Sequence, residues 1–111
     1  MATSPTQRTL AMMREQGYVC WITEHWNYYA KIRQDLFGFI DILCLKKGEI
    51  IGVQTTSYSN VSARVKKIND HDNVSVVRAA GIKIVVHGWH KSGTIWKCRI
   101  VDLSEEHKDG E

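Results

Sequence analysis

The chain has little of what marks secreted, membrane and zinc proteins. Its three cysteines, Cys20, Cys44 and Cys98, lie far apart, and none falls in a CxxC or Cys/His spacing, which argues against a zinc site. Their odd number and apolar surroundings predict buried free thiols in a reducing, cytoplasmic compartment. No stretch approaches the roughly 18 apolar residues of a membrane span, and the N-terminus lacks an apolar signal-peptide core. We therefore expect a soluble intracellular protein without a membrane partner.

Length and composition predict one α/β domain over residues 1–103, followed by an acidic flexible tail over 104–111. A chain of 111 residues with 43% hydrophobic and 24% charged residues suffices for a stable core. The tail carries four acids against one Lys, so the body is more basic than the net charge of +3 suggests. A basic body suits a polyanion such as DNA, and it equally suits an ordinary soluble protein.

Apolar periodicity and turn residues predict a mixed central sheet flanked by helices, which contains a core in the order αβββαβ. Helices are expected over residues 5–16, 59–68 and 74–80. Strands are expected over residues 18–26, 37–45, 50–55, 82–87 and 94–103. Residues 27–34 are expected to form a loop and residues 88–93 a turn. Because the strand over 82–87 follows a helix, it should join the sheet in parallel.

One predicted hairpin should bring two polar side chains together. With a tight turn over 47–48, Lys46 pairs with Glu49, and Asp41 then lies opposite Gln54. Opposed residues hold their Cβ atoms roughly 4.5–5.5 Å apart, close enough for a carboxylate and an amide oxygen to bind one Mg²⁺. Polar residues at strand ends are also common without a ligand. Asp41, however, lies inside an apolar run, and a buried carboxylate needs a partner or a metal.

These residues and the order of elements around them resemble the PD-(D/E)xK nuclease superfamily. Asp41 matches the family's central Asp, and Gln54-Thr55-Thr56 stands where the family has (D/E/Q)-x-K. The approach Gly38-Phe39-Ile40-Asp41 is most similar to archaeal-type Holliday-junction resolvases and small resolvase-like phage proteins. The resemblance covers about residues 4–103. It implies a restriction-endonuclease-like core, a homodimer, and Mg²⁺- or Mn²⁺-dependent hydrolysis of branched or Holliday-junction-like DNA.

The resemblance also implies a ligand set. Asp41 would be the principal metal ligand, joined by the side-chain oxygen of Gln54 and the backbone carbonyl of Thr55. One carboxylate and one amide hold Mg²⁺ weakly, so a further acid is expected. Glu24, near the end of the first predicted strand, is our choice, and Asp35 is the alternative.

The chain departs from the family at two positions. The family's extra acid lies on the first helix, where this chain has Thr or Gln at residues 6–7, and Thr56 replaces the family's lysine. Some members supply the missing cation from the following helix. There Arg64 is expected to lean toward the sheet, whereas Lys66 and Lys67 are expected to face solvent. If none of them reaches the site, the domain would bind DNA without cutting it.

Basic and aromatic side chains elsewhere are candidates to bind nucleic acid. The full set is Lys31, Arg33, Arg64, Lys66, Lys67, Trp89, His90 and Lys91. On the predicted turn, Lys91 would contact phosphate and Trp89 would stack or wedge, although Trp89 also suits a core position. Trp21 and Trp26 are expected to anchor the core. A third possibility, that the domain binds a protein partner, has only the aromatic stretch over 21–29 in its favour.

Overall fold

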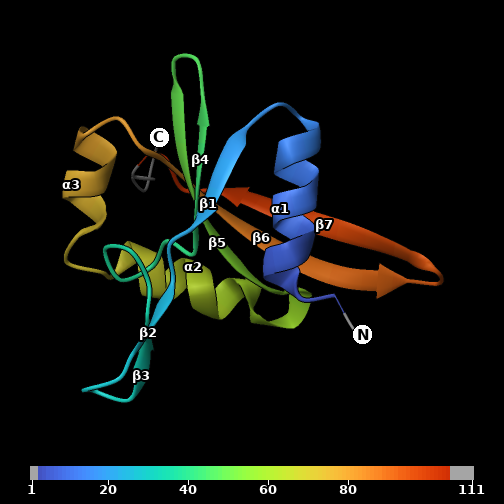
Figure 1. Cartoon of the computed structure of the whole chain (residues 1–111), viewed down its shortest axis with the longest axis horizontal. Helices are drawn as coiled ribbons and strands as arrows, with labels where there is room; N and C mark the ends of the chain where they lie inside the picture. The colour runs from blue at the N-terminus through green and yellow to red at the C-terminus, as the bar shows by residue number, and fades with distance from the viewer. Residues whose placement is uncertain (1–2, 106–111) are drawn as a thin grey trace, which may run out of the picture.

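The computed structural model describes residues 3–105 and shows a mixed α/β fold, which confirms the predicted class (Figure 1). A five-stranded mixed sheet in the order β1-β4-β5-β6-β7 is flanked by helices, and β2 and β3 form a separate hairpin. The helices are α1 (Pro5–Glu15), α2 (Val61–Asn69) and α3 (Val74–Ala79), with a 3₁₀ turn η1 (Tyr58–Asn60) before α2. The strands are β1 (Val19–Ile22), β2 (His25–Asn27), β3 (Ile32–Gln34), β4 (Ile42–Lys46), β5 (Glu49–Ser57), β6 (Lys83–Ser92) and β7 (Ile95–Asp102).

Local signals set the ends of α1 and the register of the β4–β5 hairpin. Ser4 caps α1 by accepting a hydrogen bond from the backbone N–H of Gln7, and Gly17 follows the helix with a positive φ of 93°. In the hairpin Lys46 pairs with Glu49, as the sequence predicted. The chain then enters η1 and α2 and returns as β6, which pairs in parallel with β5 and confirms the predicted crossover.

The sheet is covered on both faces, as the apolar residues on both sides of the central strands require. On one face Leu10 and Met13 of α1 pack on Ile42, Cys44 and Val53. On the other face, helices α2 and α3 cover a second cluster that includes Phe39, Ile40, Val61, Ile68, Ile84 and Val86. Burial of both faces holds the central strands in place. The candidate site lies where two of them, β4 and β5, diverge.

The predicted strand over 18–26 is wrong in its extent, because the chain breaks after β1. The backbone N–H groups of Thr23 and Glu24 both donate to the carbonyl of Asp41, at 2.8 and 3.3 Å, and the Thr23 hydroxyl donates to the carbonyl of Ile40. These bonds turn the chain out of the sheet. It continues as β2, which pairs with β3, so the predicted loop over 27–34 contains a strand.

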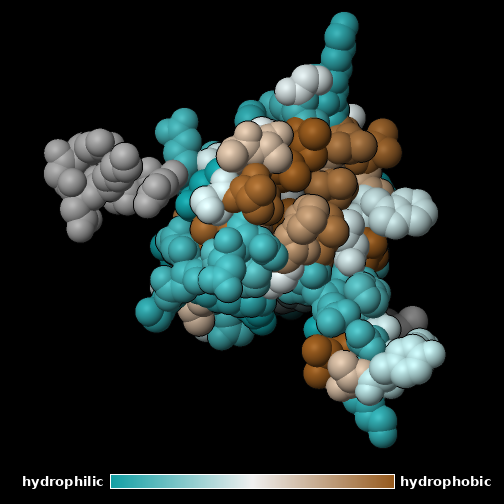
Figure 2. All heavy atoms as spheres, turned by 90° about the vertical axis from the view of Figure 1, so that its left-hand side faces the viewer, coloured by the Kyte–Doolittle hydropathy of each residue, from teal (hydrophilic) through white to brown (hydrophobic). Residues whose placement is uncertain are grey.

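Trp21 and Trp26 do not anchor the core, contrary to expectation. Trp21 is 76% exposed and Trp26 is 47% exposed. Cross-strand partners share a face, and Val19, Leu45 and Ile50 follow one another across β1, β4 and β5 with their side chains exposed. They form an apolar patch at this end of the sheet, visible in Figure 2. These side chains belong to neither helix-covered core cluster, so this end of the sheet stays uncovered.

The predicted turn over 88–93 is also wrong, since β6 runs on to Ser92 and pairs with β7 over its whole outer half. Gly88, which suggested a turn, serves packing instead. A Cβ at this position would lie 2.1 Å from Cγ2 of Val61, so the glycine lets α2 approach the strand. Trp89 is therefore a strand residue.

Two of the three cysteines behave as predicted. Cys20 and Cys44 are buried free thiols that face each other across β1 and β4, with their sulfurs 3.2 Å apart. Cys98, on the edge strand β7, is only partly buried, which corrects its assignment to the core. Among the described residues there is no helix with the length and apolar character needed to cross a membrane. Most of the predicted acidic tail, residues 106–111, lies outside the described residues.

Candidate functional site

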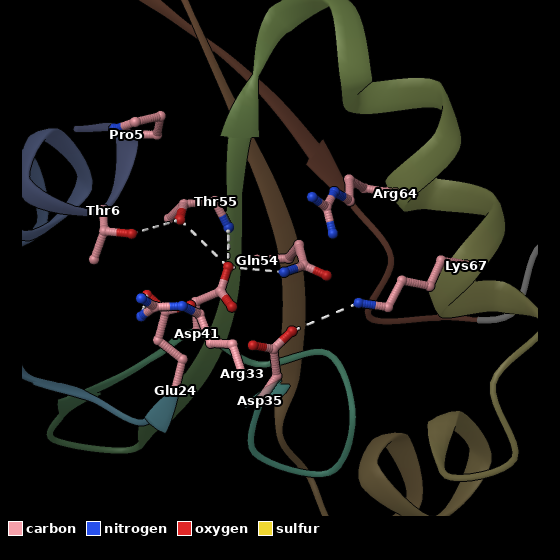
Figure 3. A pocket seen from close by; sticks show the side chains of 10 residues that line it. All are labelled: Pro5, Thr6, Glu24, Arg33, Asp35, Asp41, Gln54, Thr55, Arg64 and Lys67. Atoms are coloured by element: carbon pink, nitrogen blue, oxygen red, sulfur yellow. Dashed lines mark hydrogen bonds and ion pairs between the residues drawn. The ribbon is translucent and has the colours of Figure 1, made fainter. Parts of the chain in front are cut away.

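A hollow of about 330 Å³ opens where β4 and β5 diverge beside the N-terminal end of α1 (Figure 3). The predicted residues that it collects are Glu24, Arg33, Asp35, Asp41, Gln54, Thr55, Arg64 and Lys67. They come from the β1–β2 break, the segment from β3 to β4, the strand β5 and the helix α2. Pro5 and Thr6 of α1 complete the wall. Segments distant in sequence therefore meet at one polar site.

Asp41 is the centre of the hydrogen bonding in this hollow. Its carboxylate is buried, and its Oδ2 accepts from Nε2 of Gln54 at 2.7 Å and from the backbone N–H of Thr55 at 2.8 Å. The Thr55 hydroxyl lies 3.3 Å from the same oxygen and 3.0 Å from the hydroxyl of Thr6. The predicted convergence of Asp41 and Gln54 is confirmed. Thr55 reaches Asp41 through its N–H and hydroxyl, a contact that no sequence signal indicated.

The environment raises the pKa of Asp41 to about 7. Burial is the largest cause, because it disfavours the charged carboxylate. The hydrogen bond from the Thr55 backbone opposes this shift, the neighbouring carboxylate of Asp35 adds to it, and the bond from Gln54 opposes it again. Asp41 therefore exchanges a proton near neutral pH, and a cation at this point would favour its charged form.

Three carboxylates meet in the hollow. Glu24, Asp35 and Asp41 each offer one oxygen, and these oxygens lie within 4.8 Å of one another. Carboxylate oxygens at this separation repel each other and suit a hard divalent cation. The sequence left Glu24 and Asp35 as alternatives for the further acid, and the structure brings both to Asp41. This acidic cluster could hold a metal ion.

The segment between Asp35 and Asp41 is shaped by two positive φ angles, 56° at Phe37 and 94° at Gly38. A Cβ at residue 38 would lie 2.2 Å from Nε2 of His71, which packs edge-on against the ring of Phe39 at a centroid distance of 5.3 Å. Glycine is therefore required here by both backbone angle and space. This turn is what returns the chain to β4 with Asp35 beside Asp41.

Three cationic side chains line the same hollow. Arg33 pairs with Glu24 and Lys67 pairs with Asp35, each at 3.5 Å. Arg64 lines the hollow and makes no ion pair among the described residues. In Figure 3 its guanidinium projects from α2 toward Gln54 and Thr55. Arg33 and Lys67 are thus held by carboxylates of the site. The guanidinium of Arg64 is available to bind an anionic ligand.

The expectation that both lysines of α2 face solvent is wrong for Lys67. Its long stem carries the ammonium back over the helix to Asp35, which the loop before β4 holds near α2. Lys66 does point away, since its side chain is 81% exposed and pairs with Asp70 at 3.2 Å. The expectation rested on the angular position of residue 67 around the helix and did not include the length of the Lys67 side chain, which reaches Asp35.

Two polar residues of β5, Thr56 and Gln54, differ in what they offer to the hollow. Thr56 is buried and does not line the hollow, so the position of the family's lysine carries neither a charge nor an open side chain. Oε1 of Gln54 is buried without a hydrogen-bond partner among the described residues. An unpaired amide oxygen next to three carboxylates is an oxygen-rich donor set, and it fits a hard cation.

The remaining predicted nucleic-acid residues lie outside this hollow. Lys31 is at the exposed tip of the β2–β3 hairpin with a positive φ of 55°. His90 and Lys91 lie on β6, where they line a second hollow. Trp89 is 9% exposed and its Nε1 donates to the hydroxyl of Thr9 at 3.0 Å, so it is held in place and cannot act as a free wedge.

The main hollow thus combines three carboxylates that could hold a divalent cation with three cationic groups that could bind an anion. Such a combination suits a phosphate ester, which needs its negative charge offset on several oxygens. No match to the chain was found among protein-family models, curated proteins or solved structures.

Proposed function

We propose that the chain is a metal-dependent nuclease that hydrolyses phosphodiester bonds in DNA, on a restriction-endonuclease-like core of the PD-(D/E)xK superfamily. The observation that carries the proposal is the meeting of Glu24, Asp35 and Asp41 in a hollow that is also lined by Arg64, which makes no ion pair within residues 3–105. The sheet order and the parallel pairing of β5 with β6 agree with such a core.

The proposed cofactor is Mg²⁺ or Mn²⁺, held by Asp41, Glu24 and Asp35. Gln54 through Oε1 and Thr55 through its backbone carbonyl are further oxygen donors on the same strand. When bound, the cation would offset charge on the phosphoryl oxygens and lower the pKa of a water molecule. Asp41 would act in its charged form, which the cation favours over the protonated form present at low pH.

The cationic side chains have a proposed part in binding the substrate. A metal that binds Glu24 and Asp35 would replace Arg33 and Lys67 as the charge partners of these carboxylates, and both cationic side chains are exposed enough to move away. Both would then be free to bind DNA phosphates. Arg64 would contact the reacting phosphate and stabilise its charge, in place of the lysine that Thr56 replaces.

The proposed substrate is branched or otherwise distorted DNA, and the proposed assembly is a homodimer. One chain presents one acidic cluster, and paired cuts on two strands need two such sites. The predicted backbone contacts, by Lys31, Arg33, Lys66, Lys67 and Lys91, would carry no sequence information. Recognition would then depend on the shape of the DNA.

A cleavage assay on a labelled four-way junction tests the proposal. The wild type should cut the junction with Mg²⁺ or Mn²⁺ and not with EDTA, and Asp41→Asn should abolish cutting while leaving junction binding intact. Asp70→Asn is a matched control, because this carboxylate is exposed and pairs only with Lys66. Unchanged cutting by the Asp41 variant would refute the proposed site.

A second candidate function is a DNA-binding module of the same fold that has lost catalysis. The observation in its favour is Thr56, whose buried hydroxyl cannot replace the charge of a lysine. Under this alternative the protein binds the junction with metal-independent affinity and cuts neither junction nor duplex with either cation. That outcome would favour the module over the nuclease.

A further inference from the structure

A second hollow, of about 420 Å³, lies next to the acidic one. It is formed by the N-terminal end of α1, by η1 and by the outer half of β6 and β7, which come together on one side of the molecule (Figure 1). Pro5 lines both hollows, so they adjoin at the first turn of α1. A DNA strand with a phosphate at the acidic cluster could therefore extend into this second hollow.

Aromatic rings and cationic groups form the walls. The rings of Tyr58 and His90 meet at a centroid distance of 4.7 Å with their planes tilted by 59°, and the guanidinium of Arg99 lies 5.6 Å from the centroid of the Tyr58 ring. The guanidinium of Arg8 lies 3.7 Å from the centroid of Trp96. Tyr58 is 46% exposed and Trp96 is 41% exposed, so both rings keep free surface.

The charged side chains in the wall segments of this hollow are all positive. Residues 3–14, 50–69 and 73–101, which supply all of its walls, contain no Asp or Glu. Arg8 and Lys91 line it, and Arg99 lies beside it on Tyr58. The hollow thus offers flat apolar surfaces bordered by positive charge, which is complementary to a base with its flanking phosphates.

We infer that this hollow is a subsite for one unpaired nucleobase of the strand bound at the acidic cluster. The inference rests on the proposed function and specifies its substrate. The base would contact both Tyr58 and Trp96, which line the hollow, and Arg8 and Lys91 would bind the neighbouring phosphates. A base held in an intact duplex cannot enter, so the subsite selects DNA with unpaired nucleotides near the cleaved bond.

Binding of single-stranded oligonucleotides in EDTA tests the inference without requiring cleavage. Tyr58→Ala and Trp96→Ala should each weaken binding about tenfold, the size expected for loss of a base–aromatic stack. Binding to a blunt duplex should change less than about twofold. Trp21→Ala is the matched control, because this more exposed tryptophan lies on the opposite edge strand of the sheet and should leave both affinities unchanged.

A direct readout of stacking is the fluorescence of 2-aminopurine placed in the oligonucleotide, which stacking quenches. Wild type and Tyr58→Phe, which keeps the ring, should quench it, while Tyr58→Ala and Trp96→Ala should not. An abasic oligonucleotide should bind the wild type as weakly as the intact one binds these variants. Thermal melting of each variant checks that it is folded.

The two proposals fail in different ways. If duplex and single strand lose affinity equally in the alanine variants, or if no single-stranded oligonucleotide binds, the subsite is refuted even where junction cleavage is intact. If the quenching and its loss are observed but no cation supports cleavage, the subsite stands and the nuclease proposal falls.

Discussion

The side-chain amide of Gln54 donates through Nε2 to Oδ2 of Asp41 over 2.7 Å, while its Oε1 is buried and accepts no hydrogen bond among the described residues. The amide thus satisfies the carboxylate and leaves its own acceptor unpaired. A half turn of the amide would bring its oxygen to Asp41, an arrangement that a proton on Asp41 or a cation between the two oxygens would favour. This relationship makes Gln54 a sensitive test of the site.

We predict that Gln54→Glu makes stability depend strongly on divalent metal. Without metal at pH 8, a fourth carboxylate should lower the melting temperature, because Nε2 no longer donates to Asp41 and the charges repel. With Mg²⁺ the rise in melting temperature should exceed that of the wild type, since binding to the folded state stabilises it. Differential scanning calorimetry with and without Mg²⁺ measures both. The exposed Gln16→Glu is the control, and equal metal shifts in all three proteins would contradict the prediction.

His87 supplies a second buried titrating group, on the α1 face of the sheet. Its Nδ1 lies 3.1 Å from the hydroxyl of Thr9, which also accepts from Trp89 Nε1. The hydroxyl oxygen of Thr9 accepts from the indole N–H, and the hydroxyl proton can be donated to Nδ1 in the neutral tautomer that carries its proton on Nε2. Burial lowers the pKa of His87 to about 4 from an ordinary value of 6.5.

We predict that His87 and Asp41 make opposite contributions to the pH dependence of the free energy of unfolding. Between pH 4 and 6.5 the unfolded chain holds a proton on His87 that the folded chain lacks, so this contribution is lost as the pH falls. The pKa of Asp41 is raised from 3.8 to about 7, so its contribution is present below pH 3.8 and is lost as the pH rises toward 7. Each slope is at most about 1.4 kcal/mol per pH unit.

Urea unfolding between pH 4.5 and 7 measures these slopes. Relative to the wild type, Asp41→Asn should gain stability as the pH rises, since the amide has no proton to lose and can still accept from Gln54 and Thr55. His87→Asn should lose stability as the pH rises over the same range. Parallel curves for the three proteins would show that neither group titrates as stated.

We predict that Arg64 supplies the cation that Thr56 does not. Arg64→Ala should lower the single-turnover cleavage rate by about 100-fold or more, the usual cost of removing a group that stabilises transition-state charge. Lys47→Ala, an exposed cation at the β4–β5 turn that lines neither hollow, should change it less than about twofold. Arg64→Lys should recover part of the rate. Equal rates in the two alanine variants would assign the role to Lys67 or Arg33 instead.

We predict that Gly38→Ala destabilises the fold by about 2–4 kcal/mol, the combined cost of a non-glycine residue at positive φ and of overpacking. Gly48→Ala is the matched control, because φ is 79° there but no atom lies within 4 Å of the added Cβ. Gly48→Ala should destabilise the fold by only about 1 kcal/mol, the cost of a non-glycine residue at positive φ. Combining Gly38→Ala with His71→Ala should recover stability relative to the sum of the single changes. Equal losses at residues 38 and 48 would show that His71 does not limit the space.

The sequence by itself determined the features that short-range chemistry sets. The tight turn at 47–48 predicted the pairing of Lys46 with Glu49, and that register brought Asp41 to Gln54. The apolar strand after α3 implied a parallel return, which β6 makes beside β5. Each of these follows from backbone geometry within one hairpin or one crossover.

Only the tertiary structure decided the rest. Hydrogen bonds from Thr23 and Glu24 to Asp41 end β1 early, and the positive φ at Gly38 under His71 returns Asp35 to the same place, so both candidate acids join Asp41. Trp89 is buried beneath α1, where it donates to Thr9, whereas Trp21 points to the other face of the sheet and lies outside both core clusters. No periodic pattern encodes such choices, because they depend on contacts between segments far apart in the chain.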